Sequence, residues 1–235
     1  MELNTKIRNE ATTVAGKEYY DRNYADYDRQ NAPGKLRFYK KLIQLYIEPG
    51  RRLFEVGVGC GNFLGEVRHI YQCGGCDIND YGLLQAERYV TKASLYKGST
   101  EVLCKVQNKP DVIVAWDVLE HIEYLDNALG DIRSNLVEHG YLMAVVPVYD
   151  GPLGHITRWL DDDPTHLTKE DRCFWLAKIQ KADFRIVLWG GIIRRLLIKR
   201  YYLHLTRPQW LLRHCGTAIY IVAQKVNVQS ELSNP

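Results

Sequence analysis

The 235-residue sequence predicts a single α/β domain built on a doubly wound, mostly parallel sheet. Short apolar segments that have the character of buried strands, such as residues 111–116 and 141–148, alternate with segments whose apolar residues recur at helical spacing. The length suits one well-buried domain and is short for two. An apolar fraction of 46 % and a charged fraction of 25 % are those of an ordinary globular protein.

The chain begins with a polar segment, residues 1–34, that is rich in tyrosine. Tyr19, Tyr20, Tyr24 and Tyr27 recur at helical spacing, which predicts a helix packing its aromatic face on the domain, or alternatively a lid. Residues 31–34 are expected to break this helix. Apolar residues at positions 36, 39, 42, 43, 46 and 47 then predict a helix over residues 35–47 that covers one face of the sheet.

The most informative stretch is Leu53–Val67, which has the pattern of a strand, a tight loop and a helix. Glycines at positions 57, 59 and 61 allow backbone N–H groups to approach a ligand closely. The spacing differs from the dinucleotide fingerprint because position 62 is Asn, and no Lys-Ser/Thr pair follows as in a phosphate-binding loop. The loop alone therefore leaves three interpretations open: a nucleoside site, another nucleotide site, or a turn without a ligand.

Two acids support a nucleoside. Glu55 ends the first strand, where it suits a cationic or hydroxyl-bearing group, and Asp77 ends the next strand-like segment. An acid at the second of these positions can accept both hydroxyls of a ribose. A further strand and turn, DVIVAWDVLEHI, follows at residues 111–122.

Together, E-V-G-x-G-x-G, the acid at position 77 and DVIVAWDVLEHI resemble the class I S-adenosylmethionine-dependent methyltransferases, especially the branch similar to ubiquinone-biosynthesis O-methyltransferases. The resemblance covers roughly residues 35–150. It implies a Rossmann-like sheet of seven strands with an antiparallel last strand, and S-adenosylmethionine as cofactor. It divides the domain into a lid (1–34), a cofactor-binding core (35–148) and an acceptor side (149–235).

The resemblance also implies which residues bind the cofactor. Arg37 would pair with the methionine carboxylate, and Trp116, Asp117 and Val118 would line the sulfonium end of the pocket. Ser99 stands where many relatives have an acid that binds the adenine amino group, and its hydroxyl can still accept that hydrogen bond. The expected cofactor-binding residues are Arg37, Glu55, Gly57, Val58, Gly59, Gly61, Asp77, Ile78, Ser99, Trp116, Asp117 and Val118.

The acceptor side opens with a loop of about twenty residues, a length that commonly indicates function. It carries His155, Asp161–Asp163 and His166, and a capping box formed by Thr168 and Asp171 is expected to start the next helix. His166 is the first candidate for a catalytic base. His121 is the second, although its motif is often structural, and either histidine could be a structural one.

A basic and apolar insert, residues 194–216, separates the last two expected strands. It is predicted to be an extra helical element over the acceptor pocket, a dimer contact, or, through residues 194–213, a peripheral contact with a membrane or lipophilic substrate. Packing alone is the favoured interpretation.

Composition and charge limit the kinds of partner that the chain is expected to bind. A net charge of +3 gives no support for nucleic acid, and no apolar segment is long enough to span a membrane, so a cytoplasmic protein is expected, as a monomer or homodimer. The six cysteines lack zinc-site spacing, so we expect reduced, buried thiols and no metal.

The predicted function is transfer of a methyl group from S-adenosylmethionine to an oxygen or nitrogen atom of a small-molecule acceptor. The alternatives are an RNA or protein methyltransferase, for which no recognition domain or strongly basic face is evident, and a non-catalytic partner subunit that binds the nucleoside.

Overall fold

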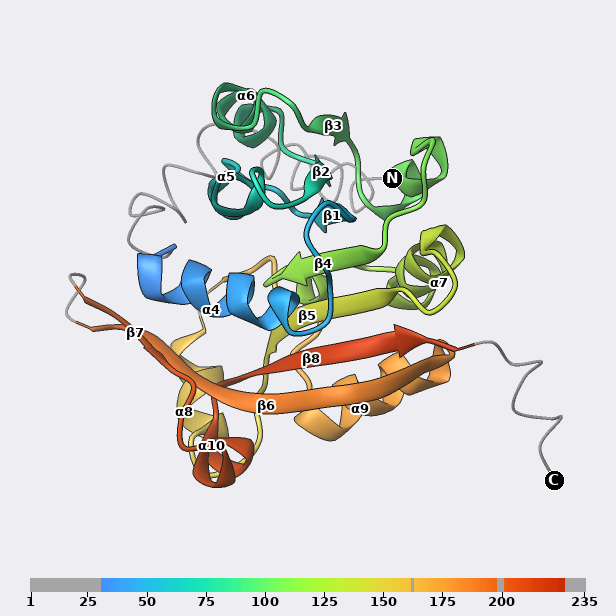
Figure 1. The fold of residues 1–235 in the computed structure, drawn as a ribbon. Coiled ribbons are helices and arrows are strands. Elements are labelled where there is room, and N and C mark those ends of the chain that lie inside the picture. Colours follow the sequence, from blue (N-terminus) through green and yellow to red (C-terminus); the bar gives the residue numbers. More distant parts are fainter. Residues whose placement is uncertain (1–30, 162, 198–200, 227–235) are drawn as a thin grey trace, which may run out of the picture.

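A computed structural model describes residues 31–161, 163–197 and 201–226. One sheet contains eight strands in the order β3-β2-β1-β4-β5-β8-β6-β7 (Figure 1). The strands are β1 (Arg52–Val56), β2 (Gln72–Asp77), β3 (Ser94–Lys97), β4 (Val112–Trp116), β5 (Tyr141–Pro147), β6 (Phe184–Leu197), β7 (Tyr201–Leu205) and β8 (Ala218–Lys225). The tyrosines of the expected N-terminal helix lie outside the described residues.

The sheet confirms the predicted α/β class. Strands β1 to β5 pair in parallel, and β8 is antiparallel to both β5 and β6. The count is eight rather than seven because the insert adds β7, which pairs antiparallel with the far half of β6.

Helices cover both faces of the sheet, giving three layers (Figure 1). One face packs against α4 (Pro33–Gln44), α5 (Asn62–Val67) and α6 (Asp80–Tyr89), and the other against the 3₁₀ turn η1 (Thr100–Lys105), α7 (Leu125–Asn135) and α9 (Arg172–Lys181). Strand β4 shows why both faces are apolar: Val112 and Val114 face the first layer, whereas Ile113 and Ala115 face the second. None of the described helices has the length and apolarity needed to cross a membrane.

Two helix boundaries and one additional helix differ from the prediction. Helix α4 begins at Pro33, whose missing N–H and fixed φ suit the first helical turn. Helix α9 is capped by Asp171, whose side chain accepts the N–H of Phe174 at 2.6 Å, so the expected capping box at Thr168 is not formed. The long acceptor-side loop contains a short helix, α8 (Gly154–Leu160), and His155 lies on it with its side chain exposed.

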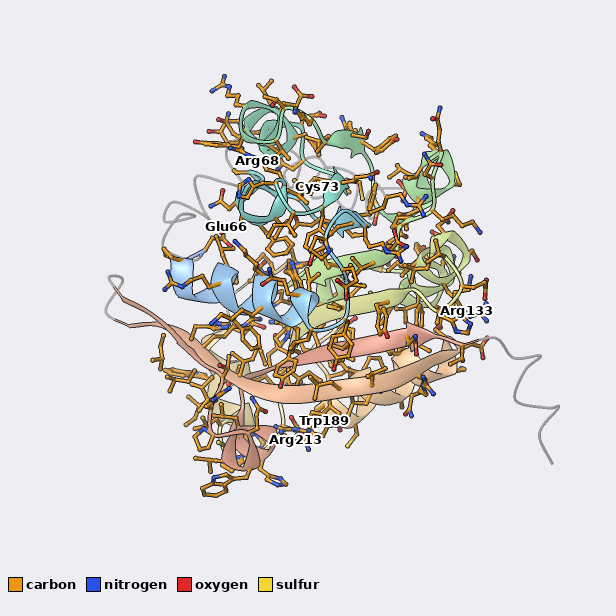
Figure 2. All side chains as sticks on the ribbon, in the orientation of Figure 1. Glu66, Arg68, Cys73, Arg133, Trp189 and Arg213 are labelled. Atoms are coloured by element: carbon orange, nitrogen blue, oxygen red, sulfur yellow. The ribbon has the colours of Figure 1, made fainter. Side chains whose placement is uncertain are left out.

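The insert forms the end of β6, β7 and helix α10 (Gln209–Cys215). Helix α10 packs directly on the β6 backbone at Gly190 and Gly191, since a Cβ at position 191 would lie 1.8 Å from the carbonyl oxygen of Leu212. The amide of Gln209 donates to the carbonyl of Gly191 at 3.0 Å and accepts its N–H at 2.9 Å. The guanidinium of Arg213 lies 4.9 Å from the ring centre of Trp189 (Figure 2), so α10 is fastened to the sheet at both ends.

The six cysteines are free thiols, as predicted, but they are not all buried. Cys76 is buried, while Cys104 and Cys173 are exposed. Cys73 and Cys76 lie three residues apart on β2, so their side chains point to opposite faces of the sheet. Their C-x-x-C spacing therefore does not form a joint site.

Candidate functional site

The carboxyl ends of β1, β2 and β4 lie side by side at one edge of the sheet. Val56 is in register with Cys76 on one side and with Ala115 on the other. Strand β1 is also where the strand order reverses, and open α/β sheets bind ligands outside the strand ends at such a switch point. The loops after these three strands therefore meet where a cofactor is expected.

The glycine loop after β1 needs its glycines for backbone conformation. Gly57, Gly59 and Gly61 have φ angles of 78°, 55° and 84°, in the region that side chains disfavour. Gly57 has a second constraint, because a Cβ there would lie 2.2 Å from Cγ2 of Val118, in the loop after β4. The structure thus brings two predicted cofactor-binding segments into direct contact.

Asp77, at the end of β2, holds this loop. Its carboxylate accepts the N–H of Gly59 at 2.7 Å through one oxygen and that of Asn79 at 2.8 Å through the other. Each oxygen keeps a second lone pair that can accept a hydroxyl. Burial raises the pKa of Asp77, although the backbone N–H groups oppose this effect. Ile78, which follows, has 52 % of its surface exposed at the same edge.

Glu55 is a buried acid beneath the loop. It is 3 % exposed, and among the described residues one of its carboxylate oxygens has no hydrogen-bond partner. Burial raises its pKa well above the usual value, nearby Asp77 adds to this, and Lys35 opposes it.

Lys35 is a buried cation in this region. Its side chain points into the fold from the first turn of α4, and its Nζ lies 3.3 Å from a carboxylate oxygen of Asp117. Arg37, the residue we expected to pair with a carboxylate, has an exposed side chain on the other side of the helix. The sequence did contain the signal, because position 35 shares the buried stripe of Tyr39 and Leu42, whereas position 37 does not.

Asp117 is held by two cations from distant parts of the chain. Arg194, on β6, donates to its second oxygen, so the carboxylate lies between Arg194 and Lys35. Burial raises the pKa of Asp117, but the two cations outweigh it and hold the pKa well below its usual value. His204, on β7, lies close by, and its ring packs against those of Phe38 and Tyr39 at 5.6 and 5.9 Å. Strands β6 and β7, here called the β6–β7 arm, therefore lie beside α4 (Figure 1).

Trp116 and Ser99, two other predicted cofactor-binding residues, are not fully exposed. Trp116 is only 8 % exposed and stacks on Tyr39, with ring centres 4.3 Å apart. Ser99 follows β3 at the same edge, and its backbone N–H donates to Glu101 at 2.9 Å while its carbonyl accepts from the thiol of Cys76 at 3.4 Å.

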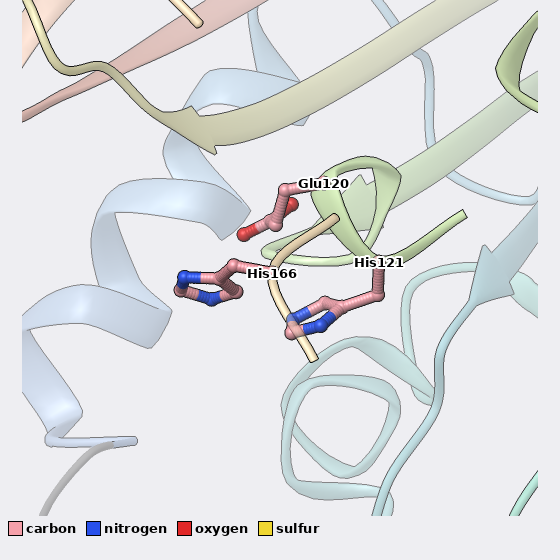
Figure 3. Close-up of side chains that lie close together, drawn as sticks. All are labelled: Glu120, His121 and His166. Atoms are coloured by element: carbon pink, nitrogen blue, oxygen red, sulfur yellow. The ribbon is translucent and has the colours of Figure 1, made fainter. Parts of the chain in front are cut away.

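Figure 3 shows a second cluster just beyond β4, formed by Glu120, His121 and His166. The first two lie on a short 3₁₀ turn, η2 (Leu119–His121), and the third lies in the loop before α9. The carbonyl of Glu120 accepts the N–H groups of Leu167 and Thr168 at 2.9 and 3.0 Å, so the backbone fixes one segment on the other. The two imidazole rings are 4.7 Å apart.

Polar neighbours orient both imidazoles. His121 Nδ1 lies 3.0 Å from the carbonyl oxygen of Thr165, which can only accept, so Nδ1 carries the proton. His166 Nδ1 lies 2.8 Å from Oδ2 of Asp161, which also accepts the hydroxyl of Tyr149. Burial raises the pKa of Asp161, but the hydrogen bonds from His166 and Tyr149 outweigh it and lower the pKa to about 2. Within the part of the chain that the structure describes, the hydrogen bonds of both rings are thus made through Nδ1, which leaves Nε2 for another group.

Glu120 is the acid of this cluster, and it is fully buried. It is 0 % exposed, and neither carboxylate oxygen has a hydrogen-bond partner among the described residues. Burial, and then the charge of Asp117, raises its pKa well above the usual value. Burial and His166 lower the pKa of His121, which favours a neutral imidazole.

Comparison with known proteins gives one sequence match and many structural ones. Residues 25–188 match the profile of a methyltransferase domain. A search of curated protein sequences finds no significant match.

Solved structures agree with the fold at low identity. A Thermotoga maritima S-adenosylmethionine-dependent methyltransferase, described as a possible histamine N-methyltransferase, has a TM-score of 0.62 and 15 % identity over 88 % of this chain and 98 % of its own. An Archaeoglobus fulgidus S-adenosylmethionine-dependent methyltransferase has a TM-score of 0.62 and 19 % identity, and the match covers 86 % of this chain and 100 % of its own. A third structure is described as a complex between the Haloferax volcanii Trm112 methyltransferase activator and a methyltransferase. It has a TM-score of 0.66 and 14 % identity, and the match covers 89 % of this chain and 95 % of its own.

Proposed function

The chain belongs to the methyltransferase-domain family and uses S-adenosylmethionine as its methyl donor, and we propose that it methylates an oxygen or nitrogen atom of a small-molecule acceptor. The observation that carries the proposal is the position of His121 and His166. Both imidazoles are oriented through Nδ1. His121 lies on the turn that follows β4, and the loop before α9 brings His166 beside it.

The donor site is proposed from the glycine loop and its neighbours. Asp77 would accept the ribose hydroxyls, and Gly57, Val58, Gly59 and Gly61 would let the backbone lie against the nucleoside. The amino-acid end of S-adenosylmethionine carries both a carboxylate and an ammonium group. Lys35 and Asp117 offer the two opposite charges at one place, so they suit it better than exposed Arg37.

The chemistry needs little from the protein beyond placement. The acceptor's oxygen or nitrogen attacks the methyl carbon, the C–S bond breaks, and its electron pair stays on sulfur as S-adenosylhomocysteine forms. Holding the acceptor in line with that bond supplies most of the rate enhancement. A hydroxyl acceptor must also lose a proton, and His166, held by Asp161 and Tyr149, is the first candidate to take it.

Cofactor binding tests the donor site. Asp77→Asn keeps one acceptor oxygen but loses the charge, so the affinity for S-adenosylhomocysteine should fall about 10- to 100-fold in calorimetry. The matched control is Asp80→Asn, three residues along, where an exposed carboxylate pairs with Lys97. Because Asp77 also holds the glycine loop, thermal unfolding of each variant is recorded alongside. Equal affinities for the two folded variants contradict the donor site.

Turnover tests the acceptor side. Wild-type protein with labelled S-adenosylmethionine and a panel of hydroxyl and amine compounds should give a methylated product. His166→Asn should lower kcat by about 10²- to 10⁴-fold while S-adenosylhomocysteine affinity stays within about twofold of wild type. Normal cofactor binding without turnover on any small acceptor would instead support the alternatives, a macromolecular acceptor or a non-catalytic subunit.

A further inference from the structure

We propose that Glu120, His121 and His166 bind a divalent transition-metal ion of the zinc or manganese class. A carboxylate oxygen and one ring nitrogen from each histidine lie within 4.8 Å of one another (Figure 3). Two imidazoles and one carboxylate are a common ligand set for catalytic ions, which keep further coordination positions open for water or substrate.

The burial of Glu120 is the first argument. Its carboxyl group is 0 % exposed and neither oxygen has a hydrogen-bond partner among the described residues. A carboxylate in such a place is unfavourable unless a cation compensates it. The nearby cation, Arg194, already binds Asp117, and Asp163 adds further negative charge nearby. A bound metal ion would supply the missing positive charge.

The orientation of the histidines is the second argument, and it is independent of the first. Ligating histidines usually donate the N–H that does not face the metal to a carboxylate or a carbonyl group. His166 lies against the carboxylate of Asp161 at 2.8 Å, and His121 against the carbonyl of Thr165 at 3.0 Å. Both rings are therefore turned so that Nε2 is the atom left for an ion.

The backbone brings the ligands together before any ion binds. Glu120 and His121 are adjacent on η2, and the hydrogen bonds from Leu167 and Thr168 to the Glu120 carbonyl hold His166 beside them. Ligands at 2.0–2.2 Å from one tetrahedral ion lie about 3.4 Å apart, so binding requires inward movements of about 1 Å.

A metal at this place also refines the acceptor, and this step rests on the proposed function. The ion would coordinate a hydroxyl oxygen of the acceptor and lower its pKa, so that the proton leaves to solvent and the oxygen attacks the methyl group. The histidines then act as ligands, and the ion replaces a protein base. The acceptor class is accordingly one with a hydroxyl group.

Metal binding is measured directly, without cofactor or acceptor. Chelator-treated protein is titrated with ZnCl₂ and separately with MnCl₂ by calorimetry, and one ion should bind per chain. Glu120→Gln and His166→Asn should each weaken binding by at least about 100-fold, and Asp161→Asn by about 10- to 100-fold. The matched controls are Glu123→Gln and His155→Asn, whose exposed side chains lie outside the cluster and should leave the affinity unchanged.

A folding control accompanies each variant. Metal should raise the Tm of wild-type protein and of the controls but not that of Glu120→Gln. Without metal, the Tm of Glu120→Gln should be no lower than that of wild type, because a neutral amide replaces a buried acid. Absence of one-to-one binding, or equal affinity in Glu120→Gln and Glu123→Gln, overturns the metal site. Undiminished methyl transfer by metal-free enzyme overturns the role in acceptor activation while leaving the proposed methyl transfer intact.

Discussion

Arg194→Met should lower the free energy of unfolding by about 2 kcal/mol. Removing one member of a buried ion pair costs about 3–5 kcal/mol, because the remaining charge loses its compensation. The cost is smaller here because Lys35 stays 3.3 Å from Asp117 and because the Asp117 side chain is 24 % exposed. Methionine preserves most of the packing of the arginine stem.

Urea unfolding at pH 7, followed by circular dichroism, measures this loss. The control is Arg185→Met on the same strand, where an exposed guanidinium donates to Gln224 at 2.6 Å and removal should cost less than about 0.5 kcal/mol. In an Asp117→Asn background the effect of Arg194→Met should shrink by about 1–2 kcal/mol. Equal losses for the two arginine variants, or strict additivity with Asp117→Asn, would refute the reasoning.

The effect should also depend on pH in a definite direction. The cations hold the pKa of Asp117 below its unfolded value of about 3.9, so the stability it contributes is present above that pH and is lost as the pH falls through the folded pKa. The difference between wild type and Arg194→Met should therefore be largest near neutrality and decline below about pH 4.

The remaining predictions use the same unfolding measurements or thiol chemistry. Gly57→Ala should lower the free energy of unfolding by about 2–4 kcal/mol, since its Cβ would lie 2.2 Å from Val118 and φ is +78°. The control is Gly130→Ala, in open space on α7, which should be neutral or stabilising. Similar losses for the two variants would contradict the steric argument. Burial first, and then the charges of Lys35 and Arg194, lower the pKa of His204 to about 4. Neutral His204 therefore costs the fold nothing above its unfolded pKa of about 6.5. As the pH falls from about 6.5 to 4, the unfolded chain binds the proton first, and the free energy of unfolding should drop by up to about 3 kcal/mol. His204→Phe should flatten that slope and exposed His155→Phe should not; parallel slopes would count against the assignment. Exposed Cys104 and Cys173 should react with a disulfide reagent at pH 8 well before Cys73, because burial raises the pKa of Cys73 to about 12. Detection of fewer than six reactive thiols in denaturant would exclude the free-thiol assignment.

The part of the fold that follows local pattern could be predicted from the sequence. The apolar run of β4 and the glycine loop after β1 identify a parallel sheet with a tight loop at its strand ends, because strand burial and positive φ leave direct traces in residue type. Asp77 is in this group, since its position at the end of β2 needs only the strand assignment.

Lys35, the buried cation beside Asp117, was not among the predicted site residues, although the helical pattern contained its position. The stripe of Leu36, Tyr39 and Leu42 contains position 35 and leaves Arg37 on the exposed side. The role of Arg37 itself remains a prediction.

Other site residues depend on pairing between distant segments and leave no local trace. Arg194 meets Asp117 across 77 positions, and Thr165 meets His121 across 44. Their contacts follow from the β6–β7 arm and from the backbone bonds to Glu120, neither of which hydrophobic periodicity encodes. Glu120 itself lay within the recognised VLEH segment, but only the tertiary structure reveals its burial beside two histidines.

The two glycines beneath α10 give a way to trace this accessory helix in other proteins. Because a side chain at either position would collide with the helix or with Tyr220, a protein that carries the same helix should keep Gly-Gly in the strand. It should also keep an amide residue about 18 positions further along, where Gln209 bonds both backbone groups of Gly191. A sequence with the same core but with branched residues in place of that pair would be expected to lack a helix packed in this position.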